Sequence, residues 1–141
     1  HLSKNHKEIS AEAFAYLYHR FDGITWYVQY VLNMLYTSIT DKPLLEEDDV
    51  KFAIDGILAQ HRFAYQALIY QLTAKQKQVL TAIALEGKPS SLMSQEFLQK
   101  YHLGASTVQG AVKTLLDRDF ITQDEGVYQL CDKFLELSLR G

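Results

Sequence analysis

Residues 73–130 read TAKQKQVLTAIALEGKPSSLMSQEFLQKYHLGASTVQGAVKTLLDRDFITQDEGVYQL, and the order of elements in this stretch is the strongest indication of the fold. Thr73 opens a helix whose apolar residues recur at helical spacing, and residues 92–102 form a second helix. A break at Gly104 precedes a third helix over residues 105–118. Two β-like runs follow, at residues 120–123 and 127–130, joined by Asp124-Glu125-Gly126. The stretch therefore predicts three helices and a hairpin.

Helix–helix–turn–helix–hairpin is the order of a winged helix, in which the second and third helices form a helix-turn-helix. The inner face of the third helix is predicted at Val108, Val112, Leu115 and Leu116. Its outward residues, the candidate contacts to nucleic acid or a partner, are Ser106, Thr107, Gln109, Gly110 and Lys113. Such side chains can bond phosphates or base edges, and small residues allow close approach to a groove. The alternative is that Ser106 and Thr107 cap the helix while Gln109 and Lys113 are solvated.

The charge of this stretch argues against a dedicated DNA reader. The chain has a net charge of −3. Residues 1–73 carry six Lys/Arg and nine Asp/Glu, giving −3, and residues 74–141 carry eight of each, giving zero. A nucleic-acid-binding domain is usually basic. Asp124 and Glu125 at the hairpin tip would also meet phosphates with the wrong sign.

The first half of the chain is predicted to be helical. Ser10 caps a helix to about Phe21, and a second helix over residues 24–40 is apolar nearly all round its circumference. Four acidic residues at 46–49 open a long helix to residue 72. The predicted fold class is mainly α, with a helical lid-like domain over residues 1–72 and a winged-helix domain with a small β-hairpin over residues 73–141.

No pattern in the sequence supports catalysis. A phosphate loop, a dinucleotide-binding glycine fingerprint and a nucleophile elbow are all missing from it. No His-x-x-x-His or Cys-x-x-Cys pair supports zinc, and the acidic run at residues 46–49 is interpreted as a solvated helix start rather than a metal site. His61 is interpreted as a hydrogen-bonded core histidine. The sequence thus predicts no catalytic residue and no metal ligand, so that the chain is not an enzyme.

Composition bounds the setting of the protein. The chain has 141 residues, of which 48% are hydrophobic, so it can bury a core. No run of about 18 apolar residues predicts a membrane span, and the first residues do not read as a signal peptide. The single cysteine, Cys131, excludes an internal disulfide and is interpreted as a small packing residue. We expect a cytoplasmic protein.

Both halves resemble one protein family. Residues 21–29 and 32–36 resemble the helical lid that follows the nucleotide-binding core in AAA-related, STAND-type ATPases of the archaeal-type ATPase family. Residues 72–76 and 83–87 resemble the next helix of that family. Similarity to its C-terminal winged helix is carried by residues 103–109, Leu115, Ile121, Tyr128 and Asp132-Lys133-Phe134. The resemblance covers nearly the whole chain, and the order of these short motifs is its strongest part.

The resemblance implies that the chain is the C-terminal part of a larger ATPase, with the core upstream in cis. ATP and Mg²⁺ are then cofactors of the full-length parent, and none is expected in this chain. A Gly-x-Pro near the nucleotide base in the family corresponds here to Gly23-Ile24-Thr25, with Thr25 in place of proline. Gly23 and Thr25 are therefore candidate cofactor contacts, while a plain interhelix turn explains Gly23 equally well.

The implied role is mechanical. The lid would report the nucleotide state, and the winged helix would relay it to DNA, to a partner protein or to the ATPase core. Two other classes compete with this one. The first is a free-standing winged-helix transcription regulator whose first half is a dimerisation or effector domain. The second is a protein-interaction adaptor that uses the acidic hairpin tip or the aromatic helices.

Overall fold

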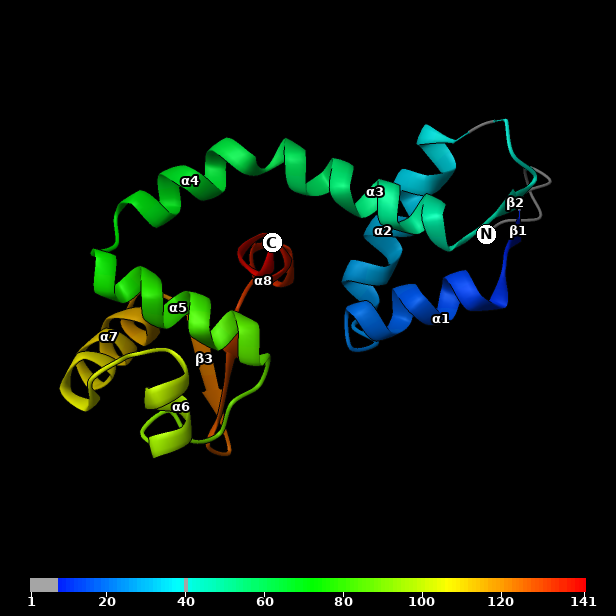
Figure 1. Cartoon of the computed structure of the whole chain (residues 1–141). Coiled ribbons are helices and arrows are strands. Elements are labelled where there is room, and N and C mark those ends of the chain that lie inside the picture. The colour runs from blue at the N-terminus through cyan, green and yellow to red at the C-terminus, as the bar shows by residue number, and fades with distance from the viewer. Residues whose placement is uncertain (1–7, 40) are drawn as a thin grey trace. The chain divides into compact units, whose positions relative to one another are not determined.

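The computed structural model describes residues 8–39 and 41–141 (Figure 1). The chain divides into two compact units, His1–Gln60 and His61–Gly141. Helices dominate both units and the strands are short, which confirms the predicted mainly α fold class with a small hairpin. The helix end predicted at Thr40 lies outside the described residues. Within those residues, no helix combines the length and the apolar character that a membrane crossing requires.

The described residues of the first unit form three helices and one short strand pair. Its elements are β1 (Glu8–Ile9), α1 (Ala11–Arg20), α2 (Thr25–Ser38), β2 (Leu44–Leu45) and α3 (Glu47–Gln60). Helix α3 packs against both α1 and α2. The largest fully buried side chains of this unit are Leu17, Phe21, Leu35, Leu45 and Ile57. Strand β1 pairs in parallel with β2, a contact that the sequence did not predict.

Polar side chains fix the starts of two helices in this unit. The hydroxyl of Ser10 accepts a hydrogen bond from the N–H of Ala13 at 3.1 Å, as predicted for the cap of α1. At the start of α3, the Asp49 carboxylate accepts from Lys42 Nζ at 2.8 Å and from the Glu46 N–H at 2.9 Å. Burial alone would raise the pKa of Asp49, but these two hydrogen bonds outweigh it and hold the pKa below its ordinary value. The acidic run therefore serves the helix start.

The second unit contains the winged helix. Its elements are α4 (Arg62–Tyr70), α5 (Ala74–Glu86), α6 (Gln95–Lys100), α7 (Ala105–Asp117), β3 (Ile121–Asp124), β4 (Val127–Leu130) and α8 (Lys133–Arg140). The strands are antiparallel, paired from Ile121↔Leu130 to Asp124↔Val127. Helix α5 is central, because it packs against α7, α8 and β4 (Figure 1). The predicted order of helices and hairpin in residues 73–130 is confirmed.

The long helix predicted over residues 46–72 is interrupted at His61. Helix α3 ends at Gln60, and α4 belongs to the second unit. The side chains of Tyr65 and Ile69 on α4 pack against the winged-helix core. Tyr65 also donates a hydrogen bond to Asp132 at 2.9 Å. Packing thus divides the chain after Gln60, ahead of the boundary that the composition suggested after residue 72.

His61 lies at the turn between α3 and α4 rather than inside the core. Its side chain is half-buried and its ring stacks on Tyr65, with the centroids 5.5 Å apart. The interpretation as a core histidine is therefore wrong in its placement. The helix is interrupted at His61, which leaves the side chain at the edge of the core. Its ring also stacks on the buried Phe134, with the centroids 6.2 Å apart.

Helix α8 closes the second unit and was not predicted. Its cap is Asp132, whose carboxylate accepts hydrogen bonds from the N–H of Phe134 at 2.9 Å and of Leu135 at 3.3 Å. Cys131, directly before the cap, is exposed, so its interpretation as a packing residue is wrong. Desolvation of the thiol, with the charges of Asp119 and Asp132, raises the pKa of Cys131 above its ordinary value.

Candidate recognition surface

Helices α6 and α7 form a helix-turn-helix. The hydroxyl of Ser94 caps α6 by accepting from the N–H of Phe97 at 3.2 Å. In the turn, His102 has a φ of +54° and Leu103 is buried, which anchors the turn to the core. Helix α7 begins after Gly104, whose carbonyl accepts from the N–H of Val108 at 3.0 Å. The turn therefore fixes where α7 starts and which of its faces points outward.

The inner face of α7 packs into the core of the second unit. Val108, Ala111 and Leu115 are buried, and Val112 and Leu116 are partly buried against the same core. This confirms the four inner residues predicted from the sequence and adds Ala111. With this face buried, the opposite face is free to meet another molecule.

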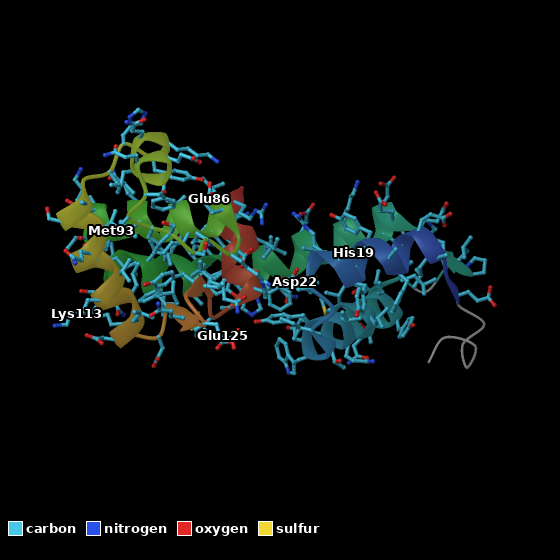
Figure 2. The ribbon with its side chains drawn as sticks, turned by 90° about the horizontal axis from the view of Figure 1, so that it is seen from below. His19, Asp22, Glu86, Met93, Lys113 and Glu125 are labelled. Atoms are coloured by element: carbon cyan, nitrogen blue, oxygen red, sulfur yellow. The ribbon has the colours of Figure 1, made fainter. Side chains whose placement is uncertain are left out.

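The predicted contact residues share the outer side of α7. Four of them are exposed and Thr107 is half-buried; the exposed ones are Ser106, Gln109, Gly110 and Lys113. Lys113 projects away from the helix (Figure 2). A Cβ at Gly110 would meet no atom within 4 Å, so the surface there is open. The N-cap residue of α7 is Gly104 and no side chain caps it, so Ser106 and Thr107 are not explained as caps.

The hairpin forms the wing. Its two-residue loop has positive φ at Glu125 (+52°) and Gly126 (+80°), which is the pattern of a type I′ turn. The Tyr128 N–H donates to the carbonyl of Pro89 at 2.8 Å and ties the hairpin edge to the loop after α5. The sequence predicted the hairpin but not this additional edge contact, because the partner is a backbone carbonyl in a loop.

The electrostatics of the surface are close to neutral. Helix α7 carries one lysine and one aspartate, Lys113 and Asp117. Both Asp124 and Glu125 are exposed at the wing tip, and Figure 2 labels Glu125 there. At the end of α7, the guanidinium of Arg118 donates to the Gln71 carbonyl at 3.4 Å. The described surface thus offers hydrogen-bonding groups without the concentrated positive charge of a typical DNA reader.

The other predicted pair, Gly23 and Thr25, lies in the first unit. Gly23 has a φ of +69° in the turn between α1 and α2, and Thr25 is the first residue of α2. A Cβ on Gly23 would lie 2.6 Å from Cζ of Tyr18. The space at this glycine is therefore filled by a ring of the same unit, which favours the interhelix turn as its explanation. The nucleotide contact stays a prediction.

No metal centre is formed by the side chains that the structure describes. Across residues 8–39 and 41–141, no three His, Cys, Asp or Glu side chains are grouped closely enough to hold an ion. The acidic residues at the start of α3 are instead engaged by lysines. Lys42 contacts Asp49, and Lys51 contacts Glu47 at 3.1 Å.

A helix-turn-helix with a buried inner face and an exposed outer face, followed by a hairpin wing, defines a winged-helix protein. A family model described as "Probable winged helix domain" matches residues 63–141, more than half of the chain, and the chain belongs to this family. The matched region begins within α4, so it includes the helix that packs against the winged-helix core. Neither the curated proteins nor the solved structures gave a match. Winged-helix domains commonly contact DNA or proteins, and the outer face of α7 is exposed in this chain.

Proposed function

We propose that the chain is a non-catalytic regulatory and interaction module of a P-loop ATPase, in which the outer face of α7 contacts a protein surface. The observation that carries this proposal is the outer face itself, which is polar, open at Gly110 and nearly neutral beside an acidic wing tip. A protein surface tolerates this balance of charge, whereas a phosphate backbone favours a basic face. The resemblance of both halves to lid and winged helix supports the ATPase parent.

The first unit supplies a second surface for such a role. Large apolar side chains are exposed on it, including Trp26 (61%) and Phe52 (71%). Large exposed apolar side chains of this kind can take part in a contact with another protein. In the proposal, this unit packs on the ATPase core and reports its nucleotide state, and the winged helix passes that state on. Gly23 and Thr25 belong to the same proposal as contacts to the adenine base.

The absence of catalysis in the isolated chain is directly testable. Purified, folded chain incubated with ATP and Mg²⁺ is expected to release phosphate at the rate of the protein-free blank. As a control, phosphate release and unfolding of the chain are both followed as urea is added. A contaminating ATPase is expected to lose its activity at a different urea concentration from that at which the chain unfolds. Steady phosphate release that disappears at the same urea concentration at which the chain unfolds would contradict the proposal.

A free-standing DNA-binding regulator is the second candidate, favoured by the exposure of Gln109 and Lys113 on the recognition helix. It requires binding to a randomised duplex pool at about 50 mM salt, with a steep loss of affinity as salt rises. Lys113→Gln should then weaken binding and lower the salt slope by about one. Lys75→Gln, an equal charge change outside α7, is the matched control. Our proposal expects that the chain does not bind the DNA pool. It also expects that an immobilised cognate ATPase core captures the chain, whereas immobilised DNA does not.

A further inference from the structure

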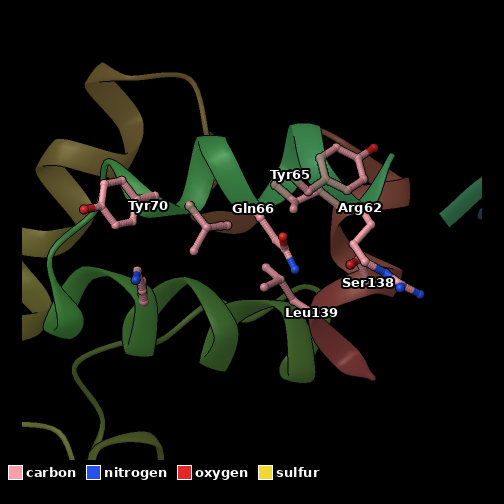
Figure 3. Close-up of a pocket in the computed structure, with 9 residues that line it drawn as sticks. Arg62, Tyr65, Gln66, Tyr70, Ser138 and Leu139 are labelled. Carbon is pink, nitrogen blue, oxygen red and sulfur yellow. The ribbon is translucent and has the colours of Figure 1, made fainter. Parts of the chain in front are cut away.

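A pocket of about 320 Å³ lies in the second unit between α4, α5 and α8 (Figure 3). Most of its wall is apolar: Tyr65 and Ile69 come from α4, and Leu135 and Leu139 come from α8. Small-molecule sites are concave, mainly apolar and about 300–1,000 Å³ in volume. The pocket therefore has the size and the wall of a small-ligand site.

The charges at this pocket have one sign. Arg62, the first residue of α4, and Lys77, in the first turn of α5, both line it, and its lining contains no Asp or Glu. Neither cation forms an ion pair with another residue that the structure describes. An apolar wall with unpaired cations attracts an anion and repels a cation.

The neutral polar groups of the pocket are few. Tyr65 already donates its hydroxyl hydrogen to Asp132 at 2.9 Å, so this group is engaged away from a ligand. Gln66, Tyr70 and Ser138 remain as lining residues with a neutral polar group, and all three are labelled in Figure 3. A ligand with many polar groups would leave several of them unsatisfied against Ile69, Leu135 and Leu139. The lining thus favours a ligand that is apolar except for its anionic group.

We propose that this pocket binds a small amphipathic anion, an aliphatic or aromatic body that carries one carboxylate. The apolar body lies against Ile69, Leu135 and Leu139, and the carboxylate is held by Arg62 or Lys77. Helix α5, which brings Lys77 to the pocket, also packs against α7. The site therefore belongs to the same unit as the recognition helix, and it does not depend on which partner α7 contacts.

The chemistry of the ligand is tested with three ten-carbon probes, decanoate, decanol and decylamine. Each is titrated into the whole chain below its micelle concentration, and heat of binding is measured by calorimetry. Decanoate is expected to bind saturably at one site, about tenfold or more tighter than decanol, and decylamine is expected to bind more weakly still. Equal affinity for the three probes, or no saturable binding of decanoate, would overturn the proposal.

Substitutions locate the site. The double variant Arg62→Gln, Lys77→Gln should lose the preference for decanoate over decanol, while Lys113→Gln on α7 should keep it. Ser138→Trp, which fills the pocket from an exposed position on α8, should abolish binding of decanoate and decanol together. Circular dichroism of each variant verifies its folding, and the Ser138 variant tests the site without touching a charge. A double variant that binds decanoate as tightly as the parent would contradict the assignment.

A second copy of the chain is the competing occupant of the pocket. Sedimentation of the ligand-free chain separates the two cases. If the pocket binds a small anion, Ser138→Trp should leave the association state of the chain unchanged. Association that is lost in this variant and is unaffected by decanoate would assign the pocket to a protein contact instead.

Discussion

Two glycines of this chain have opposite backbone environments. Gly23 has a φ of +69°, and the ring of Tyr18 fills the position that its Cβ would take. Gly110 lies inside α7 with open space around it. The first glycine is required by its turn, whereas the second weakens a helix, since glycine in a helix interior costs about 1 kcal/mol relative to alanine. Because Gly110 has no side chain, a partner can approach the backbone of α7 closely at this position.

Replacing Gly23 should destabilise the first unit. Gly23→Ala adds a methyl group against Tyr18 at a positive φ, so we expect a loss of more than about 1 kcal/mol in the free energy of unfolding. Gly56→Ala is the matched control, because Gly56 lies inside α3 with no atom within 4 Å of its Cβ position. That variant should be neutral or more stable. Urea denaturation followed by circular dichroism measures both, and equal effects would refute this explanation of Gly23.

Replacing Gly110 should separate stability from recognition. Gly110→Ala is expected to raise the free energy of unfolding by about 0.8–1 kcal/mol, because it removes the helix penalty without creating a clash. If the partner approaches α7 closely, the same methyl group weakens partner binding. Denaturation and a binding titration on the same protein distinguish the two effects. A variant that is both more stable and equally tight would place the contact elsewhere on α7.

At the scale of elements, one cluster joins the end of α5 to α6. The Glu86 carboxylate accepts hydrogen bonds from Lys100 Nζ at 2.7 Å and from the Tyr101 hydroxyl. The hydrogen bond from Lys100, followed by that from Tyr101, holds the pKa of Glu86 below its ordinary value of 4.5, against the opposing effect of burial. The cluster fixes α6 at the end of α5 and thereby supports the helix-turn-helix.

The pH dependence of stability should reveal this cluster. Because its folded pKa is lowered, Glu86 contributes stability that is fully present above pH 4.5 and is lost as the pH falls through the folded pKa. Glu86→Gln should lower the free energy of unfolding at neutral pH and make its fall at acidic pH (the acid limb of the pH profile) less steep. Glu96→Gln on α6 is the control, since Glu96 forms no ion pair with a described residue. Identical acid limbs in the parent and in Glu86→Gln would contradict the role of this carboxylate.

Elements with their own capping and turn signals were predictable. Thr73 and Gln76 form a reciprocal capping box at the start of α5, and glycine ends this helix at Gly87. Helix α8 escaped prediction because Leu135, Leu137 and Leu139 alternate in the manner of a strand, while its cap at Asp132 is a single weak signal. The outer residues of α7 followed from helical periodicity, whereas the pocket lined by Arg62 and Lys77 depends on tertiary packing that one sequence does not display.

At the scale of the whole molecule, the chain consists of two packed units that meet in sequence at Gln60 and His61. The break at His61 does not follow from composition, because apolar spacing continues through it from α3 into α4. What assigns α4 to the second unit is packing: Tyr65 and Ile69 cover the winged-helix core, and Tyr65 bonds Asp132. The winged helix of this protein is therefore completed by a helix that precedes its first predicted element.

Truncation tests this boundary. A fragment of residues 61–141 should unfold cooperatively, whereas a fragment of residues 73–141 should be less stable by about 2–4 kcal/mol. The shorter fragment loses the buried Leu72, the packing of Tyr65 and Ile69, and the hydrogen bonds from Tyr65 to Asp132 and from Arg118 to Gln71. Urea denaturation of both fragments gives the difference. The matched control is Phe63→Ala in the longer fragment, since Phe63 is 82% exposed and its removal should change stability little. Equal stability of the two fragments would indicate that the boundary between the units lies after residue 72.

We propose that this winged-helix chain is the output module of a P-loop ATPase. The most direct test of this proposal is the coding sequence immediately upstream of His1 in the native gene. We expect this sequence to encode, in the same reading frame, a nucleotide-binding core with a Gly-x-x-x-x-Gly-Lys-Ser/Thr phosphate loop. An initiation codon directly before His1, with no such core in frame, would contradict the claim and leave the DNA-binding regulator as the better explanation.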